Sequence, residues 1–200
     1  MSLIIQTPPT SEPVSLPEAK SFLRITDVDD DALISSLIVA VRQKAETWTR
    51  RLFVTQTWTL WQDSVPQGFT LSIPLSPLQS VTHIKSYDLA NGASTFDSSK
   101  YLVDGSSTPG RVALNDGQTW PSVLRKINAL EVEFVAGFGG ASSVPEPIKQ
   151  GILQWIKLLF ANKSKLYESD ESTAGLLEFN RIPIPPAVMV LWEPYRVFKI

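Results

Sequence analysis

The stretch that decides the fold is DALISSLIVAVRQKAETWTRRL, residues 31–52. Apolar residues recur in it at steps of three and four, which places them on one face of an amphipathic helix. The members of this face are Leu33, Ile34, Leu37, Ile38, Val41, Ala45, Trp48 and Leu52, and the cations Arg42, Lys44, Arg50 and Arg51 mark the other face and the C-terminal end. The stretch therefore predicts a long helix with one packed face and one face that is solvated or meets a partner.

A shorter helix is predicted just upstream, over about residues 16–24. Ser15 precedes Glu18 by three residues and Pro17 lies between them, which is the pattern of a capping box with proline in the first turn. The acidic run at residues 27–31 follows, and its carboxylates can accept hydrogen bonds from the free N–H groups of the long helix.

The same acidic run matches the opening of a calcium-binding loop, but the match does not continue. Ala32 stands at the sixth position, where the loop turn needs glycine, and Ile38 stands at the twelfth, where a bidentate glutamate belongs. Helix capping is the better interpretation, and we expect no metal site.

From about residue 54 the pattern changes to short segments rich in Thr, Val, Ile and aromatic residues, separated by Pro, Gly, Asn and Asp. In the last segment Leu130, Val132 and Phe134 alternate with Glu131 and Glu133, which is typical of a strand with one buried face. The predicted strands are 55–62, 69–73, 80–88, 94–97, 100–103, 110–114 and 129–136. Their number and spacing predict a small antiparallel β-sandwich or barrel.

Helical periodicity returns after residue 139. Ile148, Ile152, Trp155 and Leu159 predict a helix that ends near residue 162, and a last short helix is expected near 186–193, after a loop at 164–181. The predicted fold class is thus α+β. An N-terminal helical part (1–53) and C-terminal helices with a tail (139–200) form one helical core, and the β-module (54–138) is inserted between them.

Composition excludes several classes of function. Lys and Arg total 18 against 20 for Asp and Glu, so a formal charge of -2 gives no broad attraction to nucleic acid or anionic membranes. The absence of cysteine excludes disulfides and thiolate chemistry and fits synthesis in a reducing cytoplasm. No stretch approaches the roughly 18 consecutive apolar residues that a membrane-spanning helix needs.

Nothing in the sequence predicts catalysis. His83 is the single histidine and falls in a predicted strand, so it has no second imidazole for a metal site and is interpreted as a surface or satisfied strand residue. No nucleophile and base occur at a recognisable spacing. We expect no enzyme activity, no catalytic residue, no cofactor and no metal.

The C-terminal tail is the strongest candidate for partner binding. Trp192, Pro194, Tyr195, Arg196 and Phe198 are of the types that dominate protein–protein hot spots, and an exposed tail would present them to a partner. In the alternative, the tail folds back onto its own helices.

Short motifs with a recognisable order extend over residues 15–198. They are Leu16-Pro17-Glu18-Ala19-Lys20, Asp29-Asp30-Asp31-Ala32-Leu33-Ile34, Thr55-Gln56-Thr57-Trp58, Pro77-Leu78-Gln79-Ser80-Val81, Val135-Ala136-Gly137-Phe138-Gly139, Val144-Pro145-Glu146-Pro147-Ile148-Lys149-Gln150 and Pro194-Tyr195-Arg196. In this order the chain resembles the head-tail connector (adaptor, head-completion) proteins of long-tailed phages and gene-transfer particles, in the larger subgroup with a β-insertion.

The resemblance implies a virion structural protein at the head-tail junction. It would form a ring of twelve copies beneath the portal protein, with the tail-side completion (stopper) protein below and DNA passing through without specific binding. The tail residues would contact the portal, and Arg42, Lys44, Arg50 and Arg51 would contact neighbouring subunits. Deletion of residues 191–200 is then expected to abolish portal attachment and leave the fold intact.

The competing hypothesis is a non-catalytic β-rich module that recognises a glycan or a cell-surface ligand. Six tryptophans could supply stacking platforms for such a ligand. Exposed, coplanar tryptophans would favour this hypothesis over the connector.

Overall fold

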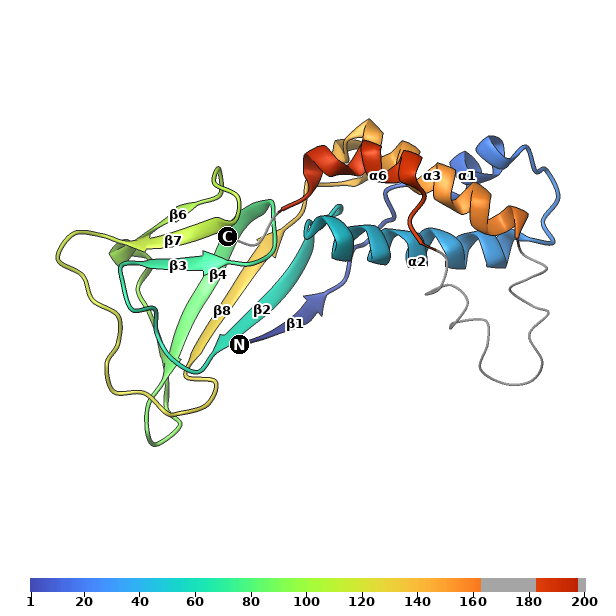
Figure 1. Cartoon of the computed structure of the whole chain (residues 1–200). Helices are drawn as coiled ribbons and strands as arrows, with labels where there is room; N and C mark the ends of the chain where they lie inside the picture. The colour runs from blue at the N-terminus through green and yellow to red at the C-terminus, as the bar shows by residue number, and fades with distance from the viewer. Residues whose placement is uncertain (163–182, 198–200) are drawn as a thin grey trace. The chain divides into compact units, whose positions relative to one another are not determined.

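The computed structural model describes residues 1–162 and 183–197, which form two compact units. The β-unit comprises residues 1–11 and 50–140, and the helical unit comprises the described residues of 12–49 and 141–197. The described residues contain four α-helices and two antiparallel sheets, so the predicted α+β class is confirmed (Figure 1).

The helical unit contains α1 (Leu16–Leu23), α2 (Asp31–Thr49), α3 (Glu146–Ala161) and α6 (Pro186–Trp192). The predicted capping box starts α1: the Ser15 hydroxyl accepts from the Glu18 backbone N–H at 3.3 Å, and the Glu18 carboxylate accepts from the Ser15 N–H at 2.7 Å. The apolar faces of α2 and α3 are buried as their periodicity predicts. The acidic run precedes α2, where Lys20 of α1 donates to the Asp31 carboxylate at 2.6 Å.

Helix α2 ends three residues earlier than predicted, at Thr49. Arg50 adopts a left-handed conformation (φ 56°), which stops the helix, and Arg51 pairs with Ser76 in an isolated bridge. Leu52 continues the helical spacing but is buried in the core of the β-unit, where its N–H donates to the Ser76 carbonyl at 2.8 Å. The predicted end of the helix was wrong because the spacing of apolar residues indicates that Leu52 is buried but does not indicate in which core.

The β-unit holds a five-stranded sheet of order β1-β2-β8-β4-β5 and a three-stranded sheet of order β3-β7-β6 (Figure 1). The strands are β1 (Ser2–Thr7), β2 (Gln56–Gln62), β3 (Thr70–Ile73), β4 (Leu78–Tyr87), β5 (Ala93–Thr95), β6 (Tyr101–Asp104), β7 (Gly110–Leu114) and β8 (Leu130–Ala136). The seven predicted strands are confirmed, with ends that differ by no more than two residues.

One strand was not predicted. Residues Ser2–Thr7 form β1, which pairs with β2 so that Leu3 lies opposite Leu60, although the sequence assigned residues 1–53 to the helical part. Leu3-Ile4-Ile5 is too short an apolar run to reveal alternation, and pairing with a strand some fifty residues away makes it a strand.

Both sheets contribute to one core. Alternate residues of β8 point inward, and Val132 lies between Leu60 of β2 and Ile84 of β4. Leu71 and Val112 of the three-stranded sheet belong to the same buried cluster. In the part of the chain that the structure describes, β1 and β5 are the edges of the five-stranded sheet and do not pair with each other, so it does not close into a barrel, which was one of the two predicted forms.

Candidate interaction surfaces

The C-terminal part of the helical unit is anchored by Trp192, the last residue of α6. Its ring is fully buried, with ring centroids 6.3 Å from Trp48 of α2 and 5.9 Å from Trp155 of α3. Its indole N–H donates to the Ile148 carbonyl at 3.2 Å. A β-carbon at Gly151 would lie 2.2 Å from the Trp192 Nε1, so the close approach depends on glycine. For Trp192, the structure therefore follows the alternative in which the tail folds back onto its own helices.

Beyond Trp192 the chain stays attached to α2 but presents polar and aromatic groups. Residues Glu193–Tyr195 form a 3-10 turn, the Arg196 guanidinium lies 4.7 Å above the Trp48 ring, and the Val197 N–H donates to the Thr49 carbonyl at 2.9 Å. Pro194 and Arg196 are exposed and Tyr195 is half-buried. Phe198, also predicted to bind a partner, lies outside the described residues.

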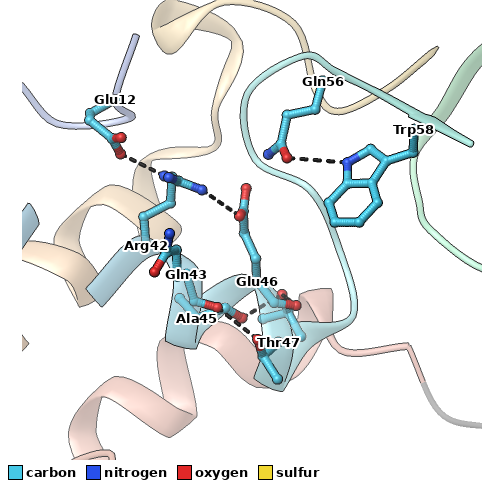
Figure 2. Close-up of polar contacts among 9 residues, drawn as sticks. Glu12, Arg42, Gln43, Ala45, Glu46, Thr47, Gln56 and Trp58 are labelled. Atoms are coloured by element: carbon cyan, nitrogen blue, oxygen red, sulfur yellow. Dashed lines mark hydrogen bonds and ion pairs between the residues drawn. The ribbon is translucent and has the colours of Figure 1, made fainter. Parts of the chain in front are cut away.

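The predicted cationic face of α2 divides into different environments. The Arg42 side chain is buried between two carboxylates, Glu12 at 2.6 Å and Glu46 at 2.7 Å (Figure 2). Burial alone would lower the pKa of Arg42, but both carboxylates favour the charged form and the pKa is raised. The prediction that Arg42 lies on a solvated face was wrong, because the Glu46 carboxylate one helical turn away and Glu12 draw it inward.

The other three predicted ring-contact residues remain accessible. Lys44 is half-buried on α2, and Arg50 is exposed just after the end of α2. Arg51 is half-buried, and burial lowers its pKa. Lys44 therefore lies on α2, and Arg50 and Arg51 lie in the segment directly after it.

The outer face of the five-stranded sheet carries a polar cluster that the sequence did not predict as a group. Glu131 of β8 accepts a hydrogen bond from His83 Nε2 at 2.9 Å and another from the Tyr87 hydroxyl. Burial would raise the pKa of Glu131, but these two hydrogen bonds and nearby Lys85 hold it below its usual value. His83, as interpreted from the sequence, is a satisfied strand residue.

The tryptophans do not form a stacking platform. Trp155 and Trp192 are buried, and the other four are half-buried. Trp58 packs against the core of the β-unit, whereas Trp61 lies on the opposite face beside Tyr87. The condition that would favour a glycan-binding module, exposed and coplanar tryptophans, is not met.

Among residues 1–162 and 183–197, no group of three or more His, Cys, Asp or Glu side chains is placed to hold a metal ion. No helix in the same residues has the length and apolar character to cross a membrane.

Comparison with known proteins gives a consistent match. Residues 13–109 match the family described as phage gp6-like head-tail connector protein. The fold is similar to a chain in the neck of an empty gene transfer agent (GTA) particle computed with C6 symmetry, with a TM-score of 0.78 and 19% sequence identity, covering 100% of this chain and 97% of that one.

Two other solved structures show the same fold. One is from the virion of a native GTA particle (TM-score 0.76, 19% identity), and the other from the neck of a native GTA particle computed with C12 symmetry (TM-score 0.73, 18% identity). Each comparison covers 100% of this chain and 97% of the other. No curated protein sequence matches the chain.

Proposed function

We propose that the chain is a head-tail connector protein of the phage gp6-like type, whose family model matches residues 13–109, and that it forms a ring at the junction between head and tail. The observation that carries the ring is the structural match, since both units align over the whole chain with a subunit from a particle neck. The C6 and C12 symmetries of those necks support a ring of twelve copies here.

We infer a structural role without a chemical reaction. The ring would enclose a channel through which DNA passes. With a formal charge of -2, the chain would not hold phosphates through the many cationic contacts that make DNA binding strong. Specific DNA binding is therefore not part of the proposal.

The portal protein is the proposed partner of the C-terminal segment. Pro194, Tyr195 and Arg196 follow the buried Trp192 after one intervening residue, Glu193, so a rigid anchor holds them in place. A preorganised segment loses less conformational entropy when it binds, which favours affinity. The buried Trp192 is assigned to positioning this segment and not to contact with the partner.

The remaining surfaces have proposed neighbours. Lys44, Arg50 and Arg51 would contact adjacent copies in the ring, whereas the Arg42 side chain is buried inside its own unit. The stopper protein would dock on the tail side. The chain would divide into three parts at residues 53 and 138. The two sheets would form a sandwich, and their shared core supports this arrangement.

Native mass spectrometry of the purified chain, alone and mixed with the portal protein of the same particle, tests the ring. Ring-sized assemblies in either sample are expected. A chain that stays monomeric in both samples would overturn the proposed function.

Substitution is a better test of portal docking than deletion. Removing residues 191–200 would also remove the buried Trp192, so the fold would not stay intact after that deletion, contrary to the expectation from the sequence. Tyr195→Ala combined with Arg196→Glu should abolish portal binding and keep the circular dichroism spectrum. Lys126→Ala, an exposed cation in the β-unit, is the control and should bind normally. Normal binding by the double variant would refute the assignment of the segment.

A further inference from the structure

The five-stranded sheet has two free edges in the described residues, β1 on one side and β5 on the other. Edge strands expose unpaired backbone groups, and proteins often protect them with charged residues or proline. Neither SLIIQT of β1 nor AST of β5 contains a charge or a proline. By contrast, the edge strand β6 of the other sheet ends at Asp104, which is paired with Arg111 at 2.9 Å.

The backbone of β5 has hydrogen-bonding groups directed away from the sheet. The Phe96 N–H donates to the Ile84 carbonyl at 2.7 Å, and the Asp88 N–H donates to the Gly92 carbonyl at 3.0 Å, so the even-numbered residues face β4. Because successive residues direct their backbone groups to opposite sides, those of Ala93 and Thr95 face outward. Both residues are exposed, and their outward groups make no hydrogen bond within the described residues.

A groove runs beside this edge. It has a volume of about 620 Å³ and lies between β5 and residues 119–124. Phe96 and Trp120 line it with ring centroids 5.5 Å apart, and the Trp120 indole is fixed by donating to the Gly68 carbonyl at 2.9 Å. The volume is within the range of sites that hold a ligand. The edge of β5 therefore has both the backbone groups and the space for another strand.

The opposite edge has side chains that match this groove. Ile4 and Ile5 of β1 are 49% and 42% exposed. Ile5 lies opposite Trp58 and therefore on the core side of the sheet. Phe96, whose N–H bonds to Ile84, points to the same side. A strand β1 placed next to β5 would extend the sheet and bring Ile5 to Phe96 and Trp120.

We propose that β1 of one copy of this chain adds to β5 of the next copy in an intermolecular strand pair. Strand addition at a sheet edge supplies backbone hydrogen bonds, and the side chains supply specificity. The contact joins two different surfaces of identical subunits, so it can repeat around a closed ring. This inference rests on the proposed ring and names its interface.

Engineered cysteines test the interface directly, because the chain contains none. Ile4→Cys is combined with Ala93→Cys or Thr95→Cys, all on the outer face of the sheet. Within one copy three strands separate β1 from β5, a distance of about 19 Å at ~4.8 Å per step. A disulfide requires Cα atoms within about 7 Å, so any bond formed joins two copies.

Assemblies prepared with the portal protein are oxidised and run on a non-reducing gel. One of the two pairs should give a ladder of covalent oligomers, whereas Ile4→Cys with Leu102→Cys on β6, which is 67% exposed, should not. Rings that form without a ladder from either pair would overturn the interface and leave the proposed function standing. A chain that never assembles would overturn both.

A second pair of variants tests the edge without cross-linking. Ile4→Lys places a charge on β1 and should reduce ring formation at least tenfold, because a charged edge opposes strand addition. Leu102→Lys places the same charge on β6 and should assemble normally. Both should keep the melting temperature of the parent, and normal assembly of the Ile4→Lys variant would contradict the proposal.

Discussion

Replacing Gly151 with alanine tests the anchor beneath the C-terminal segment. The new β-carbon would lie 2.2 Å from Nε1, 2.6 Å from Cε2 and 3.0 Å from Cδ1 of Trp192. These distances are too short for nonbonded atoms, so the indole has to move and loses its 3.2 Å hydrogen bond to the Ile148 carbonyl. The substitution therefore acts at the contact that holds α6 on α3.

The expected cost follows from three effects. Overpacking a filled core costs about 1–3 kcal/mol. The lost hydrogen bond costs about 1 kcal/mol, and alanine in place of glycine within a helix returns about 1 kcal/mol. The net decrease in the free energy of unfolding is about 2 kcal/mol. For a chain of this size, that decrease lowers the melting temperature by about 4–8 °C.

A double-mutant cycle identifies the cause. Phenylalanine has a smaller ring without Nε1, the indole atom that the new methyl group meets at 2.2 Å, so in a Trp192→Phe background Gly151→Ala should cost less than about 1 kcal/mol. Thermal unfolding followed by near-UV circular dichroism measures all four proteins. If Gly151→Ala raises the melting temperature of the parent, as alanine does on an open helix surface, then Trp192 does not pack against Gly151 and the anchor is refuted.

Two other predictions concern polar groups. Glu46→Gln should lower the free energy of unfolding by about 1–3 kcal/mol, because buried Arg42 loses one of its two charged acceptors. Glu12→Gln, at a side chain that is 26% exposed, should cost less in the same urea titration, and equal stability of Glu46→Gln and the parent would contradict the assignment. Tyr87→Phe addresses the Glu131 carboxyl, whose pKa hydrogen bonds hold below the unfolded value against the opposing effect of burial. A carboxyl with a depressed pKa stabilises the fold at pH values above its unfolded pKa, and this contribution is lost as the pH falls through the folded pKa. The Tyr87→Phe variant should therefore lose less stability than the parent on acidification. An identical pH dependence of the two proteins would exclude this role.

The elements that the sequence predicted well are those with local signals. The capping box of Ser15 and Glu18 defines the start of α1 within four residues of sequence. The alternation at residues 130–134 marks β8, because a strand with one face in the core has a period of two. These signals need no knowledge of the rest of the chain, which explains why the strand bounds were so close.

The errors lie where one residue pattern fits two environments. Leu52 keeps the helical spacing but is buried in the β-unit, and a periodicity analysis assigns no core to a buried position. Arg42 has the composition of a solvated face, yet Glu12, thirty residues away, makes a buried pair possible. Strand β1 needs β2 to define it. In each case the deciding contact is distant in sequence, so no local pattern contains it.

The C-terminal tail posed two alternatives, and the structure combines them. Tryptophan is common both in cores and in binding hot spots, so composition alone could not separate an exposed tail from one folded on its own helices. Trp192 is buried because Gly151 leaves room for it, and Val197 bonds to the end of α2. Between these two attachments, Pro194 and Arg196 stay exposed. A segment that is fixed at both ends and exposed between them would bind a partner without first becoming ordered. The loss of partner binding should therefore follow substitution of the exposed residues, whereas substitution of Trp192 should reduce stability first.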